Sequence, residues 1–323
     1  MKKQKEKYIL FCQEENAIPI FSQPWWLDAV SEGGIWDVAI VERGGQIWAT
    51  MPYYIRKRYG FTFITMPILT QTLGPYIKYP KGQKYYKKLS WEKELMNELI
   101  DQLPHFDYFY QQWNYSVSNW LPFYWRGFRQ TTRYTYVIEN MLQAHNDIVD
   151  EFSHAKRKQI NKALRGGIRI IDDFSNTQNF YEMHIKELSS EGSNIQYKYE
   201  TLERIFQAIK INDGGRIFAA VDEKDNLHAA LLIIWNKYSA YDLISSFNPD
   251  FLDSGATSLL VYEAIKYCKS IGVQSFDFEG SMIENVENSF RQFATIQKPY
   301  FAISKTNSRT LKAYQVAKDI LRW

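Results

Sequence analysis

The order of strands and helices predicted for the first half of the chain recurs in the second half. Residues 36–66 form three segments rich in apolar and aromatic side chains, separated by turn residues, which predicts three strands joined by tight turns. A predicted helix and a predicted strand follow within residues 85–111. Residues 216–247 again predict three strands, and residues 256–279 again predict a helix and then a strand. This order predicts an α/β fold built from two copies of one domain.

One short match gives the period of the repeat, and a second agrees with the order of elements. Residues 38–41 (VAIV) match residues 218–221 (FAAV) at a separation of 180 residues (218 − 38), and Asp107 in FDYFY has its counterpart in Asp277 of FDFEG. A period of this length indicates duplicated domains and excludes a solenoid of short repeats. We therefore predict an N-terminal domain, a C-terminal domain that begins with a basic helix, and a final helix docked on one of them: 1–145, 146–306 (helix at 150–167) and 307–323.

The stretch from residue 248 to residue 300 contains the predicted active site. A loop at 248–255 precedes a predicted helix that Ser254 can cap and Gly272 can end. Residues 275–279 alternate polar and aromatic side chains, as a half-buried strand does, and end on Glu279. The arrangement places backbone N–H groups and the positive end of a helix dipole beside a strand terminus, which favours anion binding there.

Composition and charge limit the class of protein. The 323 residues are 45% hydrophobic and 23% charged, which predicts a globular chain. Aromatic residues make up 16%, which is explained by large aromatic cores or by aromatic-lined grooves for an extended ligand. The net charge of +3 is too small to indicate nucleic-acid binding, and we expect no DNA partner.

Cysteine usage and hydropathy bear on the compartment. Cys12 and Cys268 lie far apart without metal-binding spacing, which suits a reducing compartment. The apolar stretch near the N-terminus is too short for a signal peptide, and the longest apolar run, 229–235, is too short to span a bilayer. We therefore expect a cytoplasmic protein without a membrane anchor of its own.

A basic helix is predicted between the two halves. Its narrow apolar stripe consists of Phe152, Ile160, Ala163 and Leu164. The remaining surface carries five cations: Lys156, Arg157, Lys158, Lys162 and Arg165. Two interpretations are open, a solvated linker helix or a basic ridge over a cleft between the domains that receives a phosphate-bearing acceptor. In the second interpretation Lys156, Arg157, Lys162 and Arg165 bind the acceptor, together with Arg291.

Three stretches resemble one known family. They are FSQPWWLDAV, SHAKRKQINKALRGGIRI, and GATSLLVYEAIKYCKSIGVQSFDFEGS with the following FRQFATIQKPYF. With the element order, they resemble the FemAB-like branch of the GNAT acyltransferase superfamily. The resemblance implies two tandem GNAT-like domains, each a mixed sheet flanked by helices. The sequence departs from the family in having Phe293-Ala294 where Phe-Gly is common. It also lacks, between residues 180 and 215, the long helical hairpin of the tRNA-using members, so tRNA is the less favoured partner.

The resemblance also implies a location for an acyl-CoA donor. Its acyl arm would lie between the strands at 241–247 and 275–279, with an oxyanion donor among the backbone N–H groups near Ser245 and Ser246. Its phosphates would lie at the start of the following helix, at Ser254, Gly255, Ala256 and Thr257. An ordinary helix cap explains these four residues equally well, because one glycine is fewer than a phosphate-cradling loop normally has.

Glu279 is the candidate general base because it ends a central strand at the expected mouth of the site. The structural alternative is a salt bridge from Glu279 to Arg291 or Lys298. Tyr300 and Tyr241 are candidates to protonate a leaving thiolate, and Asp277 is interpreted as a structural acid. His184 and His228 are isolated, and the sequence has no metal-binding cluster, GxSxG motif or Walker loop, so no metal is expected.

Three hypotheses of function follow. The first is an N-acyltransferase that moves an acyl group from an acyl-CoA-type donor to an amine, with a cell-envelope sugar or peptide precursor as a candidate acceptor. The second is an aminoacyl-tRNA-dependent aminoacyltransferase that builds peptidoglycan bridges. The third is a non-catalytic protein that binds a glycan or a nucleotide-sugar through its aromatic side chains.

Overall fold

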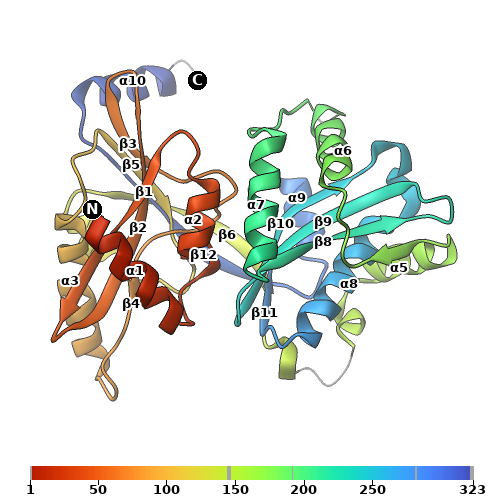
Figure 1. Ribbon diagram of the computed structural model, residues 1–323, viewed down its shortest axis with the longest axis horizontal. Coiled ribbons are helices and arrows are strands. Elements are labelled where there is room, and N and C mark those ends of the chain that lie inside the picture. The colour runs from red at the N-terminus through yellow and green to blue at the C-terminus, as the bar shows by residue number, and fades with distance from the viewer. Residues whose placement is uncertain (1, 144–146, 191, 281, 321–323) are drawn as a thin grey trace. The chain divides into compact units, whose positions relative to one another are not determined.

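The computed structural model describes residues 2–143, 147–190, 192–280 and 282–320. The chain forms two compact units (Figure 1). Unit 1 comprises Met1–Arg133 and Pro299–Trp323, and unit 2 comprises Tyr134–Lys298. Strands β6 (Arg129–Ile138) and β12 (Ile296–Thr306) each contain residues of both units.

Unit 1 contains a three-strand antiparallel meander whose third strand pairs in parallel with a later strand. β1 (Ile35–Arg43) pairs with β2 (Gln46–Arg58), and β2 pairs with β3 (Phe61–Thr65). The turn between β1 and β2 uses Gly44 and Gly45, whose φ angles of +57° and +77° suit a two-residue hairpin turn. β5 (Tyr108–Gln112) pairs in parallel with β3 and antiparallel with β12. The remaining elements are β4 (Tyr76–Ile77), α1 (Lys2–Glu14), η1 (Ile20–Ser22), α2 (Pro24–Val30), α3 (Tyr85–Asp101), α4 (Leu121–Trp125) and α10 (Arg309–Ile320).

Helices cover both faces of the unit 1 sheet. On one face Leu95, Leu99 and Phe123 from α3 and α4 pack against strand residues such as Met51 and Phe109. On the other face Tyr8 of α1 and Leu27 of α2 pack against Trp36, Val38 and Ile40 of β1.

Unit 2 repeats the same plan. β8 (Gly215–Val221), β9 (Leu227–Trp235) and β10 (Ser239–Phe247) form an antiparallel meander, and β10 pairs in parallel with β11 (Ser275–Asp277). β11 also pairs with β6, and β7 (Arg169–Ile171) pairs with β8. The other elements are α5 (His154–Arg165), α6 (Thr177–Ser190), α7 (Tyr199–Ile211), α8 (Ala256–Ser270), α9 (Glu284–Phe290), η2 (Met141–Gln143), η3 (Ile148–Glu151) and η4 (Pro249–Ser254).

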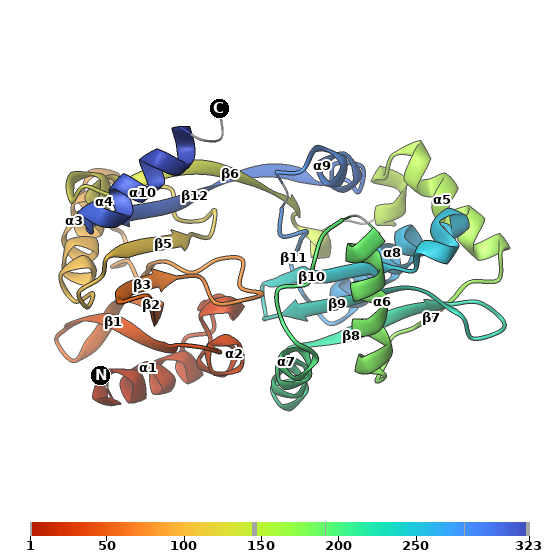
Figure 2. The same cartoon turned by 90° about the horizontal axis from the view of Figure 1, so that it is seen from above.

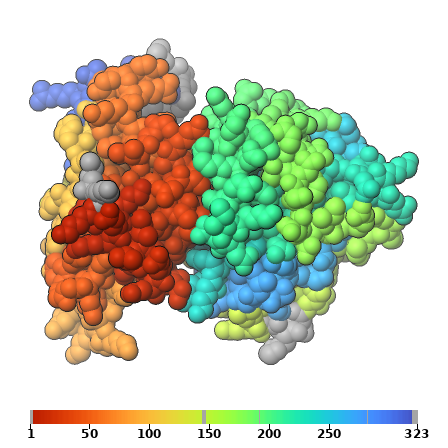
Figure 3. Space-filling view, in the orientation of Figure 1, coloured from red at the N-terminus to blue at the C-terminus, as the bar shows by residue number. Residues whose placement is uncertain are grey.

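The helices of unit 2 enclose its sheet. α7 lies on one side of β8–β10, and α8 with α5 lies on the other (Figure 2). Leu259, Leu260 and Ala264 of α8 and Ile160 of α5 form one core cluster with Phe276 of β11. In the space-filling view, the green surface of α6 and α7 covers the face of unit 2 that lies opposite α8 and α5 (Figure 3).

The predicted duplicated α/β fold is confirmed. In both units a meander of three strands is followed by a helix and then by a strand that pairs in parallel with the third strand of the meander. The predicted domain boundaries, 1–145 and 146–306, remain a prediction. The compact units differ from them in that residues 134–143 group with unit 2 and residues 299–306 group with unit 1.

Several predicted elements have different bounds in the structure. The loop predicted at 248–255 contains the 3-10 helix η4, and the strand predicted at 275–279 ends at Asp277. The final helix is α10, and residues 321–323 of the predicted helix lie outside the described residues. Among the residues that the structure describes, no helix has both the length and the apolar composition required to cross a bilayer.

Candidate active site

The candidate site lies where β10 and β11 stop pairing. The two strands pair at Ser239 with Ser275, at Ala240 with Phe276 and at Tyr241 with Asp277. β11 ends there, whereas β10 continues to Phe247 and its register on β9 shifts between Asp242 and Ile244. A gap in the backbone pairing therefore opens beside residues 242–247, at the position predicted for the arm of an acyl donor.

Asp277 fixes the turn that leaves β11. Its carboxylate accepts hydrogen bonds from the hydroxyl of Thr135 and, at 2.8 Å, from the backbone N–H of Glu279. Glu279 and Gly280 both have left-handed φ angles, +58° and +68°. A Cβ atom at Gly280 would lie 2.2 Å from the carbonyl oxygen of Tyr134, so the turn requires glycine there. Asp277 is thus a structural acid, as predicted, and it positions Glu279.

Glu279 has the properties of a proton-transfer group. Its Oε1 atom is buried and has no hydrogen-bond partner among the described residues. Burial raises the pKa of the Glu279 carboxyl well above its usual range, and the negative charges of Asp277 and Asp242 raise this pKa further. A raised pKa makes a carboxylate a stronger proton acceptor, which suits a general base.

The salt bridges proposed as the structural role of Glu279 go to other partners. Arg291 contacts Asn288, with its Nη2 2.7 Å from Oδ1, and lies 3.9 Å from Glu287. The Nζ of Lys298 lies 3.0 Å from a carboxylate oxygen of Glu139. That structural interpretation is therefore wrong in the described part of the chain, and Arg291 is an exposed residue at the end of α9.

Asp242 was not singled out from the sequence. It lies on β10 one residue past Tyr241, its side chain is 6% exposed, and its Oδ2 has no partner among the residues described. Burial raises its pKa to about 7 from an ordinary value of 3.8. The available signal was an acid inside the strand sequence SAYDLISSF, which is otherwise free of charge.

The two tyrosines proposed as acids occupy different units. Tyr241 is buried on β10 beside Asp277 and therefore lies at the candidate site. Tyr300 is buried in unit 1, where its hydroxyl accepts from Nε of Arg133 at 3.3 Å and donates to Oε1 of Gln112 at 3.4 Å.

The predicted phosphate loop at the start of α8 is packed against α5. Gly255, with φ of +76°, precedes the helix, and a Cβ there would lie 2.3 Å from the carbonyl oxygen of Gln159. The hydroxyl of Ser258 donates to the side-chain amide oxygen of Gln159 at 2.6 Å, and Ser254 Oγ accepts from the N–H of Ala256 at 3.2 Å. The close approach of Gln159 explains why glycine stands at position 255, and phosphate binding at this helix start stays a prediction.

The other predicted donor residues are divided between structural and accessible positions. Ala256 is buried in the core, and the hydroxyl of Ser246 donates to Glu187 of α6 at 2.5 Å. Ser245 and Thr257 are partly exposed. Ser245 lies on the part of β10 that has left β11, which keeps it at the candidate site.

The close approach at Gly255 leads to a stability prediction. We expect Gly255→Ala to destabilise the protein by about 1–2 kcal/mol through its left-handed backbone and by roughly 1–3 kcal/mol more through overlap with Gln159. Gly272→Ala is the matched control, because Gly272 has φ of +86° and open space around its Cβ position. Urea denaturation measures both variants, and equal losses would contradict the packing of α5 on Gly255.

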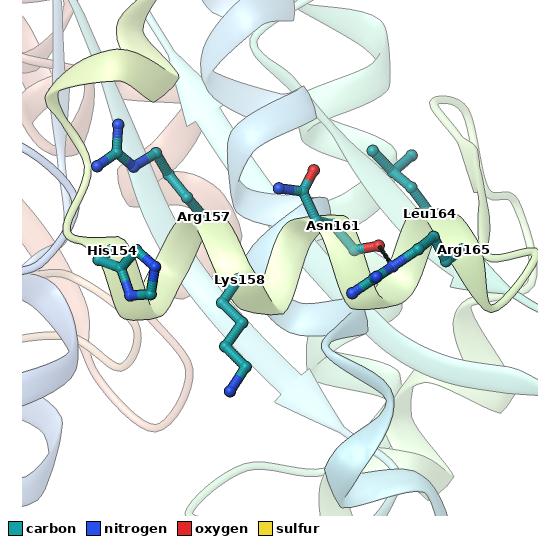
Figure 4. Close-up of a pocket in the computed structure, with 6 residues that line it drawn as sticks. All are labelled: His154, Arg157, Lys158, Asn161, Leu164 and Arg165. Carbon is teal, nitrogen blue, oxygen red and sulfur yellow. Dashed lines mark hydrogen bonds between the residues drawn. The ribbon is translucent and has the colours of Figure 1, made fainter.

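The basic face of α5 lines a shallow hollow of about 570 Å³. Its lining consists of six residues of α5: His154, Arg157, Lys158, Asn161, Leu164 and Arg165 (Figure 4). The sequence of α5 contains no acidic residue, and no described acid lies within ion-pair distance of these cations or of the exposed Lys162. Within the described ranges, the side chains of Arg157 and Arg165 donate hydrogen bonds to the backbone carbonyls of Asp150 and Asn161 respectively.

Two residues of α5 differ from prediction. Lys156 is buried and does not belong to the exposed face. Its Nζ donates to Ser289 Oγ at 2.9 Å and lies 4.4 Å from the ring centre of Phe293. Burial lowers the pKa of Lys156 to about 8. Leu164, predicted on the apolar stripe, is 54% exposed. The buried face of α5 therefore includes Lys156, which contacts Ser289 of α9, and leaves out Leu164.

The described ranges contain no group of three or more His, Cys, Asp or Glu side chains arranged to hold a metal ion. His184 and His228 each contact one carboxylate, Glu187 and Asp222 respectively, at 3.4 Å.

Comparison with known proteins gives a family match for one part of the chain. Residues 151–284 match the acetyltransferase (GNAT) domain family. This segment runs from just before α5 to the first residue of α9 and includes Asp242 and Glu279. Comparison with curated proteins finds no match.

Solved structures share the fold over nearly the full chain. FemX matches with a TM-score of 0.66 and 11% identity, covering 92% of this chain and 95% of that chain. L-PGS from Bacillus licheniformis matches with a TM-score of 0.54 and 12% identity, covering 97% and 96%. A tandem GNAT protein from the clavulanic acid biosynthesis pathway matches with a TM-score of 0.53 and 10% identity, covering 95% and 96%. At these identities the comparison establishes the fold. The chain therefore shares the fold of FemX and of a tandem GNAT protein, and its residues 151–284 are similar to the acetyltransferase (GNAT) domain family.

Proposed function

We propose that this protein is an N-acyltransferase that joins an activated acyl group to an amine at the gap between β10 and β11. The observation that carries the proposal is Glu279, a buried carboxyl with an unpartnered oxygen, directly after the last parallel pair of the two strands. An amine reaches the site largely as an ammonium ion and attacks only after it loses a proton. Glu279 is the proposed acceptor of that proton.

The geometry also suggests what stabilises the reacting acyl group. Pairing with β11 is lost beyond Tyr241, and the register shift on β9 begins at the next residue. Backbone N–H groups of residues 242–246 that point into the gap can bind the oxyanion that forms when the amine adds to the acyl carbon. Ser245 lies within this segment and Tyr241 at its start.

The donor is proposed by class only. Acyl-CoA is the donor class implied by the matched GNAT family, and a thioester is suitable because a thiolate leaves readily. The start of α8, at residues 254–257, remains the proposed position of the donor's phosphates, because a helix N-terminus offers unpaired backbone N–H groups to an anion. The alternative donor, aminoacyl-tRNA, is favoured by one observation, the acid-free basic face of α5.

A direct assay tests the function. The purified protein is incubated separately with acetyl-CoA and with a mixture of aminoacyl-tRNAs, each with a panel of amines and amino sugars, and amide products are detected by mass spectrometry. We expect amide formation with one donor class and its loss in Glu279→Gln. Binding of a sugar or nucleotide-sugar without any amide product would instead support the non-catalytic hypothesis.

The exposed cations of α5 are the proposed contacts for phosphate groups of the acceptor. We expect the double variant Arg157→Glu, Lys162→Glu to raise the KM for a phosphate-bearing acceptor about tenfold or more, which corresponds to ~1.4 kcal/mol, with donor affinity unchanged. The effect should shrink at high salt because exposed charges are screened. Lys210→Glu with Lys237→Glu is the control: it reverses two exposed charges, one on α7 across the sheet from α5 and one at the turn between β9 and β10 (Figure 2). An unchanged KM in the α5 variant would leave α5 as a structural helix.

A further inference from the structure

Asp242 lacks the contacts that normally justify a buried acid. Its Oδ2 has no partner among the described residues, although the side chain is only 6% exposed. Leaving such a group unpaired in the interior costs free energy. Two other buried acids of unit 2 show the usual arrangement: Asp277 accepts from Thr135 and Glu279, and Glu187 accepts from Ser246. Structural packing therefore explains Asp277 and Glu187 but gives no account of Asp242.

The surroundings of Asp242 connect it to Glu279. Asp242 is the first residue of β10 beyond the pairing with β11, and Glu279 is two residues beyond the end of β11, so both flank the start of the same gap. Each carries one buried oxygen without a described partner. The negative charge of Asp242 acts on Glu279.

The charged groups on the neighbouring elements leave this pair uncompensated. β11 contributes Asp277, and β6 contributes the neutral hydroxyl of Thr135. On α6, Glu187 is engaged by Ser246. The two cations considered from the sequence as partners of Glu279 contact other residues. Arg291 contacts Asn288, and Lys298 contacts Glu139. Among the described residues, the charged groups that act electrostatically on the Glu279 carboxyl are therefore both acids, Asp277 and Asp242.

We propose that Asp242 is a positioning residue for acyl transfer, whose charge acts through Glu279 and sets the pH at which Glu279 releases its proton. This inference rests on the proposed function, in which Glu279 takes the proton of the acceptor amine. Two buried carboxyls close to one another ionise in sequence, because the first negative charge opposes the second. Asp277 is held by two hydrogen bonds, so Asp242 is the neighbour whose charge can change while the turn stays intact.

The experiment follows the ionisation of Glu279 directly and through catalysis. Carbon-13 NMR of protein labelled at the Glu side-chain carboxyl gives the titration midpoint of Glu279, assigned by comparison with Glu279→Gln. Asp242→Asn should lower this midpoint by about one pH unit, because it removes a negative charge that opposes the ionisation of Glu279. The acid limb of the kcat/KM profile should shift in the same direction.

Two further variants separate a charge effect from a structural one. Asp242→Glu keeps the charge and should restore a midpoint near that of the wild type, whereas Asp242→Ser should behave as Asp242→Asn does if the latter fails to fold. Glu203→Gln, an exposed carboxyl on α7, should leave the midpoint unchanged. An unmoved Glu279 midpoint in a folded, charge-free variant overturns the inference. The NMR titration needs no substrate, so it gives this answer even if acyl transfer is not found.

Discussion

Replacing Glu279 with Gln is expected to lower kcat for acyl transfer by roughly 10²–10⁴-fold while the donor binds as before. The amide has nearly the shape of the carboxyl and cannot accept the proton of an ammonium ion. The backbone N–H of Glu279, which donates to Asp277, remains in the variant. The fold should therefore be retained, and rapid-mixing kinetics with a saturating donor would report the chemical step alone.

The control for this experiment is Glu284→Gln, because Glu284 is an exposed carboxyl at the start of α9, close to Glu279 in the sequence. The Glu284→Gln variant should catalyse acyl transfer at the wild-type rate. If Glu279→Gln keeps full turnover, the assignment of Glu279 to proton transfer fails. If it instead lowers the melting temperature and no donor binds, Glu279 is structural and the non-catalytic hypothesis gains.

Stability should fall as the pH rises from about 4 to 7 because of Asp242. Its pKa is about 7 in the folded protein against an ordinary 3.8, so the folded state holds this proton more tightly than the unfolded chain does. The contribution of Asp242 to the free energy of unfolding is complete below pH 3.8 and is lost progressively as the pH rises to 7. The difference of 3.2 pH units (7 − 3.8) corresponds to about 4 kcal/mol at 1.36 kcal/mol per unit. Glu279 acts in the same direction.

Urea unfolding of the wild type and of Asp242→Asn across pH 4 to 8 measures this loss, because the difference between the two proteins cancels the other titrating groups. The advantage of the wild type over the variant should shrink or reverse as the pH rises. Asp222→Asn is the control of opposite sign: hydrogen bonds from Asn226 lower the pKa of Asp222 to about 2, so its contribution is lost as the pH falls. A difference between wild type and Asp242→Asn that is independent of pH would contradict a raised pKa at Asp242.

Local pattern was sufficient to predict the repeated meanders. Strands β8, β9 and β10 alternate with turns at Asp225-Asn226 and Asn236-Lys237, and these turn residues are visible in the sequence. Helix α1 was not predicted, because its apolar residues YILFC are consecutive and do not recur at helical spacing. The parallel pairing of β10 with β11 followed from the family resemblance.

The missing parts of the site depend on contacts between distant residues. Asp242 could have pointed to solvent, and it is buried because of what packs on its face of the sheet, which the local sequence does not show. Gly255 was predicted as a cap, but the residue that meets it, Gln159, lies 96 positions earlier (255 − 159) and nothing near Gly255 indicates it. Lys156 looked like any other cation of its helix, and only the approach of Ser289 and Phe293 buries it.

The division of the chain into units determines the order in which they can fold during synthesis. Unit 2 is one uninterrupted segment, Tyr134–Lys298, whereas unit 1 needs residues from both ends of the chain. Its strand β5 pairs with residues 302–306 of β12, which a ribosome adds only after all of unit 2. A nascent chain that has reached Lys298 thus holds every residue of the second unit and an unfinished first one. We therefore expect the usual N-to-C order of domain folding to be reversed here, with the first unit closing after the second.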